Sequence, residues 1–86
     1  MGTADTRHSI TLPELGLEGI ATTLSVWLVP LGTEVIAGDR IVEVLAGDVT
    51  VDLPAPVTGV LIETFAVEDD PVKTGQVLGI MQETDA

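Results

Sequence analysis

Short apolar runs, each closed by glycine or proline, recur along this chain of 86 residues. In residues 49–53 every second residue is Val or Leu, and the residues between them are polar. Such alternation is typical of a strand with one buried face. A second apolar run, residues 42–45, ends just before Ala46-Gly47-Asp48, and Gly47 and Asp48 are residue types that suit a tight turn. The pattern therefore predicts a β-hairpin with Gly47-Asp48 at its tip.

Other apolar runs predict further short strands, and the sequence shows no sustained 3.6-residue spacing that would indicate a helix. We expect strands at residues 10–12, 21–29, 35–36, 40–45, 60–67 and 76–81. Pro54 and Pro56 end the second strand of the hairpin, because proline has no N–H for a sheet. An all-β domain with essentially no helix follows from this spacing.

The two halves of the chain resemble each other. Residues 35–41 align with residues 72–78 at an offset of 37 (72 minus 35). The same offset aligns Leu24 with Leu61 and Leu28 with Phe65, and Leu12-Pro13 resembles Leu53-Pro54. This repeat predicts two similar sheets related by a pseudo-twofold axis.

Charge and composition restrict the function further. Fourteen acidic and three basic residues give a formal net charge of −11, which repels nucleic acid and anionic membranes. The absence of cysteine excludes disulfides and thiol chemistry and fits a cytoplasmic protein. No apolar run reaches the roughly 18–20 residues that cross a bilayer. We therefore expect a protein partner and neither nucleic acid nor membrane.

Residues 42–44 and 50–59 are similar to the lipoyl domain of the acyltransferase (E2) component of 2-oxo acid dehydrogenase complexes. Further matches are Leu12-Pro13-Glu14-Leu15-Gly16, Trp27-Leu28 and Val72-Lys73-Thr74-Gly75-Gln76-Val77-Leu78. The resemblance implies the lipoyl/biotinyl-carrier fold, a flattened barrel or sandwich of two four-stranded antiparallel sheets. It implies a domain at residues 10–82, between a flexible tail at 1–9 and a short tail at 83–86.

In that family the hairpin tip reads Glu-Thr-Asp-Lys-Ala, and its lysine carries lipoate as an amide. The ungapped alignment places these five residues on positions 45–49, with Asp48 at the lysine position. A carboxylate has no amine to acylate, so we expect no cofactor at the tip formed by Ala46, Gly47, Asp48 and Val49. Asp48 either presents a charge to a partner or is only a good turn residue, and we favour the second interpretation.

Other candidate residues have simple structural explanations. Lys73 is the only lysine and the only fallback amine, but the repeat aligns it with Ile36, in a loop. His8 is the only histidine, and no second imidazole or thiol lies near it for catalysis or a metal. The acidic run 68–70 lacks the spaced ligands of a calcium loop and indicates a solvated turn. Three further residues, Leu17, Val29 and Leu31, could form a partner surface or pack beneath the sheet.

These observations lead to a non-catalytic lipoyl-like module that lacks the attachment lysine and acts by protein contact. Its candidate partners are components of a 2-oxo acid dehydrogenase or acyltransferase system. One alternative is a true lipoyl carrier, which requires modification of Lys73 or a natural lysine in place of Asp48. A second alternative is a lipoyl-like fragment of an export adaptor, although the chain shows no helical hairpin between its halves.

Overall fold

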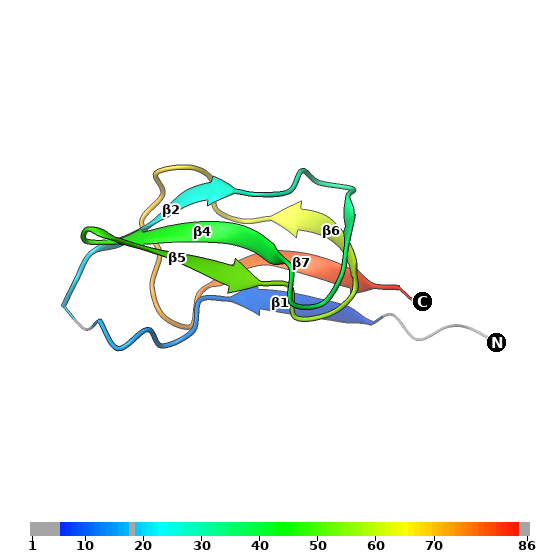
Figure 1. Cartoon of the computed structure of the whole chain (residues 1–86), viewed down its shortest axis with the longest axis horizontal. Coiled ribbons are helices and arrows are strands. Elements are labelled where there is room, and N and C mark those ends of the chain that lie inside the picture. The colour runs from blue at the N-terminus through cyan, green and yellow to red at the C-terminus, as the bar shows by residue number, and fades with distance from the viewer. Residues whose placement is uncertain (1–5, 18, 85–86) are drawn as a thin grey trace.

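A computed structural model describes residues 6–17 and 19–84, which form a sandwich of two antiparallel sheets (Figure 1). The strands are β1 (Arg7–Thr11), β2 (Thr22–Trp27), β3 (Glu34–Val35), β4 (Arg40–Ala46), β5 (Val49–Pro54), β6 (Gly59–Thr64) and β7 (Val77–Glu83). One sheet has the order β1-β7-β6-β3 and the other the order β2-β4-β5. The described residues contain no helix, so none there could span a membrane. The predicted all-β class with two antiparallel sheets is confirmed.

The predicted hairpin joins β4 to β5. Ala46 pairs with Val49, which leaves Gly47 and Asp48 as a two-residue turn. Gly47 has a φ of 61°, whereas Asp48 does not have a positive φ. A positive φ at only the first central residue defines a type II′ turn, whose twist matches that of the flanking strands.

The core lies between the two sheets and contains only apolar side chains. Along β4, Val42, Val44 and Ala46 are buried and alternate with Glu43 and Leu45. No polar or charged residue within the described ranges is buried. The stability of this small domain therefore depends on aliphatic packing, which contributes about 25 cal/mol for each Å² of apolar surface removed from water.

The sequence repeat is a repeat of structure. Adding 37 to the bounds of β2 and β4 gives the bounds of β6 and β7. Equivalent backbone hydrogen bonds follow the same offset: the Leu28 N–H donates to the Ile41 carbonyl and the Phe65 N–H to the Leu78 carbonyl, both at 2.8 Å. The predicted pseudo-twofold relation between the sheets is thus confirmed.

The second sheet has three strands, where four were expected. Residues 69–72 occupy the fourth position and make a single bridge between Thr23 and Pro71. Their counterpart in the first sheet, β3, pairs through two residues with β6. Pro71 has no N–H to donate, whereas its counterpart Glu34 in β3 has one, so this segment does not form a regular strand.

The ordered sheet also extends beyond the expected domain bounds. β1 begins at Arg7, and its pairs include Arg7 with Gln82 and His8 with Met81. Residues 7–9 therefore belong to the sheet and not to a tail, because β7 offers them backbone partners up to Glu83. Glu83, which was expected in the C-terminal tail, is the last residue of β7. Positions 1–5 and 85–86 of the expected tails lie outside the described residues.

One part of the expected repeat is shifted by two residues. The N–H and carbonyl of Leu12 bond to Gln76 and Gly75, just as those of Ala55 bond to Asp39 and Gly38. Leu12 is therefore equivalent to Ala55 and not to Leu53. The hydrogen bonds to the equivalent turn residues, Gly38-Asp39 and Gly75-Gln76, determine this alignment. The shared Leu-Pro pair does not.

Candidate functional site: the hairpin tip

The β4–β5 hairpin projects at the opposite end of the molecule from the start of β1 and the end of β7 (Figure 1). Gly47, Asp48 and Val49 are exposed, whereas Ala46 is buried. The Asp48 carboxylate makes no hydrogen bond or ion pair with any residue that the structure describes. The tip therefore presents an unneutralised carboxylate to solvent.

The loop between β1 and β2 supports the tip. The Ala21 carbonyl accepts a hydrogen bond from the Gly47 N–H at 3.3 Å. A side-chain carbon at Gly47 would lie 3.2 Å from Cγ2 of Ile20, which is itself exposed. Sequence reasoning missed this contribution of Ile20, because nothing in the pattern of this loop indicates that it returns to the hairpin.

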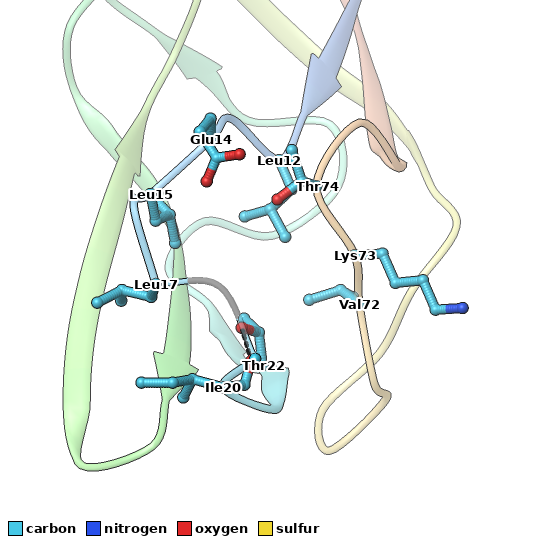
Figure 2. Close-up of a pocket in the computed structure, with 10 residues that line it drawn as sticks. Leu12, Glu14, Leu15, Leu17, Ile20, Thr22, Val72, Lys73 and Thr74 are labelled. Carbon is cyan, nitrogen blue, oxygen red and sulfur yellow. Dashed lines mark hydrogen bonds between the residues drawn. The ribbon is translucent and has the colours of Figure 1, made fainter.

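A groove of about 210 Å³ opens beside Ile20, between the β1–β2 loop and residues 72–74 (Figure 2). Leu17 is half-buried and lines the groove from one side, and Val72 lines it from the other. Leu17 thus contributes to a surface depression. The sequence also left the positions of Val29 and Leu31 undecided. Val29 packs against the core, and Leu31 is exposed.

Lys73 lies at the rim of this groove, and its side chain extends away from Val72 (Figure 2). Its N–H donates to Oε1 of Gln76 at 3.0 Å, and the Ile36 N–H donates to Oδ2 of Asp39 at 3.1 Å. These equivalent turns confirm the predicted match of Lys73 with Ile36. Lys73 is exposed, but it does not lie at the tip of a hairpin.

The histidine and the acidic run have structural roles. Nε2 of His8 lies 2.8 Å from Oε1 of Glu83, so His8 connects β1 to β7 and is not in a tail. Asp69 adopts the positive φ of the turn, and Oδ2 of Asp70 accepts the Val67 N–H at 2.9 Å. Across residues 6–17 and 19–84, no group of three acidic or histidine residues is placed to hold a metal ion.

A protein-family model described as "Biotin-requiring enzyme", the biotin/lipoyl model, matches residues 8–81. This chain belongs to the biotin/lipoyl family. One relative of this biotin/lipoyl domain is the dihydrolipoyllysine-residue acetyltransferase component of the pyruvate dehydrogenase complex of Corynebacterium glutamicum, which is 36% identical over 90% of the chain. The succinyltransferase component of the 2-oxoglutarate dehydrogenase complex of Bartonella vinsonii is 36% identical over 85% of the chain.

Solved structures share the fold of this biotin/lipoyl domain. The lipoyl domain of the 2-oxoglutarate dehydrogenase complex from Azotobacter vinelandii has a TM-score of 0.68 and 26% identity. The match covers 90% of this chain and 98% of that domain. A long-chain acyl-CoA carboxylase gives a TM-score of 0.74 at 22% identity, although the match covers only 8% of that chain. The resemblance to lipoyl domains of acyltransferase components is confirmed.

The match covers 11% of the length of the acetyltransferase and 18% of the length of the succinyltransferase. The shared part is a single biotin/lipoyl domain, which is a carrier type of module in multi-enzyme complexes and not a catalytic domain. The similarity therefore concerns this module alone.

Proposed function

We propose that this biotin/lipoyl domain is a lipoyl-type module that acts by protein contact and holds no lipoate at its hairpin tip. The observation that carries the proposal is the exposed Asp48 at the tip, where alignment with the family predicts the attachment lysine. An amide with lipoate needs an amine, and the Asp48 carboxylate offers none. The proposed setting is a cytoplasmic 2-oxo acid dehydrogenase or acyltransferase system, in line with the names of the relatives.

A lipoate carrier is the second candidate function. Its support is that relatives of this domain are named as dihydrolipoyllysine-residue acyltransferases. Lys73 is the only side-chain amine through which this chain could carry lipoate. It would have to be acylated in a loop at the rim of a groove, and not on a two-residue turn between paired strands.

Intact mass separates the two functions. The 86-residue chain is incubated with a lipoate ligase and, separately, with a biotin ligase, beside the variants Asp48→Lys and Lys73→Arg. We expect the unaltered chain to keep its mass, because its tip has no amine. We expect Asp48→Lys to gain one lipoyl group and to keep that gain when Lys73→Arg is added.

Two results would contradict the proposal. A lipoyl group on the unaltered chain that disappears in Lys73→Arg would establish the carrier function at Lys73. An Asp48→Lys variant that folds but is not modified would show that position 48 is not the position that the ligase recognises.

A further inference from the structure

Two connections cross between the sheets along one long edge of the sandwich (Figure 1). The first, residues 28–33, runs from β2 to β3, and its Gly32 N–H donates to the Leu61 carbonyl at 2.8 Å. The second, residues 65–70, follows β6, and its Asp69 N–H donates to the Leu24 carbonyl at 2.8 Å. The pseudo-twofold axis thus brings two equivalent loops to the same edge.

Both loops expose large apolar side chains. The exposed fractions are 44% for Leu28, 57% for Leu31, 54% for Phe65 and 60% for Val67. We call these four residues the crossover ridge. Burying such side chains against a partner would be favourable, because each removes apolar surface from water. Leu28 and Phe65 are equivalent positions of the repeat, so the apolar character occurs in both halves.

Trp27 is placed to report binding at the crossover ridge. The indole N–H of Trp27, the last residue of β2, donates to the Ala66 carbonyl at 2.9 Å, so the only tryptophan connects the start of the first loop to the second loop. Trp27 precedes Leu28 in the chain, and Ala66 lies between Phe65 and Val67. A partner seated on the ridge would therefore change the environment of this indole.

Negative charge flanks the crossover ridge. Glu68 and Asp69 follow Val67 directly and are exposed. A groove that Leu28 and Val29 line is also lined by three acidic residues, Asp39, Glu43 and Asp52. Arg40 is the only cation lining that groove, and its guanidinium lies 3.2 Å from the Asp52 carboxylate. Two carboxylates of the groove therefore have no cation in it.

This charge distribution favours a cationic partner over a second copy of the chain. A second copy of the chain would bring another net charge of −11 against the same carboxylates, and the repulsion would oppose association. A segment that carries lysine or arginine beside leucine-like side chains would pair with the carboxylates and cover the apolar surface. Complementary charge of this kind also accelerates encounter.

We propose that the crossover ridge is a docking surface for a basic amphipathic segment of a partner protein. The proposal rests on the proposed role as a protein-contact module and names the surface and the chemistry of the contact. The apolar face of the segment covers Leu28, Leu31, Phe65 and Val67. Its cations lie over Glu68 and Asp69 and in the groove with Asp39 and Glu43.

The probe is a synthetic helical peptide with leucine on one face and lysine on the other. Binding to the 86-residue chain is followed by Trp27 fluorescence and by mapping amide chemical shifts. We expect saturable binding with shifts concentrated in residues 24–33 and 61–70. Matched peptides with glutamate for lysine, or with serine for leucine, should bind at least about tenfold more weakly, a loss of about 1.4 kcal/mol.

Variants then separate apolar and charged contributions. The double variant Leu28→Ser with Phe65→Ser should weaken binding at least about tenfold, and Glu68→Lys should weaken it without changing an apolar side chain. Val49→Ser is the matched control, because Val49 is 52% exposed and lies in the hairpin, outside the crossover ridge and the acidic groove. It should leave the affinity unchanged. All of these residues are exposed, so folding is expected to survive.

Three results would overturn the docking proposal. These are shifts centred on residues 47–50, shifts spread over the whole acidic surface, and self-association that covers the ridge. Failure here is distinct from failure of the proposed function, which intact mass decides. Lipoylation of Lys73 would overturn the contact-only role, whereas shifts at 47–50 would keep that role and move its surface to the hairpin tip.

Discussion

At the scale of single residues, the hairpin tip depends on Gly47 more than on Asp48. The type II′ turn needs a positive φ at its first central residue, and Gly47 provides it at 61°. The absence of a side chain also leaves room for Ile20, whose Cγ2 would otherwise lie 3.2 Å from a new carbon. Asp48 occupies the second central position and projects into solvent, so the fold itself does not require a carboxylate there.

Gly47→Ala should lower the free energy of unfolding by more than Gly16→Ala does. Both glycines have a positive φ, 61° and 72°, which costs an L-residue about 1–2 kcal/mol. Only Gly47 has a neighbour in the way, because nothing lies within 4 Å of the corresponding position at Gly16. Urea unfolding of the two variants measures the difference. Equal losses would show that the Ile20 contact adds no strain.

At the scale of elements, the repeat produces matched strands that nevertheless differ in detail. β2 and β6 correspond along their whole length, yet β6 begins with Gly59 where β2 has Thr22. A side-chain carbon at Gly59 would lie 2.1 Å from the backbone oxygen of Gln82 on β7. The first sheet therefore requires glycine at a position where the second sheet accepts a side chain.

Gly59→Ala should destabilise the domain by about 2–3 kcal/mol or more, because the backbone of a paired strand must move to admit the new carbon. Gly79→Ala is a graded comparison, since its new carbon would lie 2.7 Å from the Glu63 carbonyl and 3.0 Å from the Trp27 ring. Thermal melting should rank Gly59→Ala as the less stable of the two. The opposite order would contradict the close approach of β6 and β7. Gly79→Ala should also change the Trp27 emission.

Leu24 and Leu61 occupy equivalent positions in the repeat, and both are fully buried. Truncating either one to alanine should cost about 2–5 kcal/mol, because each leaves a cavity in the same aliphatic core. We expect the two losses to be similar. Urea midpoints of Leu24→Ala and Leu61→Ala provide the test. A large difference between them would mean that the two halves contribute unequally to stability.

At the scale of the whole molecule, charge is the dominant feature. The chain contains fourteen acidic and three basic residues, and the core is entirely apolar within the described ranges. Self-repulsion of this kind destabilises a compact state, and salt screens it over about 10 Å at 0.1 M. It also keeps copies apart and favours cationic partners.

Added salt should therefore raise the melting temperature. Glu63→Lys is the matched variant, because Glu63 is exposed and the change moves the net charge from −11 to −9. It should melt higher than the parent chain at low salt and gain less from added salt. Melting curves at low and moderate sodium chloride provide the measurement. An unchanged or lower melting temperature of the parent chain in salt would exclude self-repulsion as a major term.

By itself, the sequence determined the β class, the hairpin at Gly47-Asp48, and the match of residues 35–41 with 72–78. These features depend on the alternation of residue types, on turn residues and on repetition, all of which are visible in the chain without knowledge of its contacts. Lys73 was identified as the only side-chain amine, and Asp48 was identified by alignment with the family's hairpin tip. Whether Asp48 holds the attachment position is still a prediction, because it depends on the alignment with the family.

Only the tertiary structure decided the contacts between distant segments. Ile20 supports the hairpin, and His8 pairs with Glu83, because backbone pairing brings together residues with no shared local pattern. The same holds for the crossover ridge, since the pseudo-twofold packing of two sheets places the loops 28–33 and 65–70 on one edge. The place of residues 69–72 beside β2 was also decided by the tertiary structure, because Pro71 follows β6 in the chain but pairs across the sandwich with Thr23.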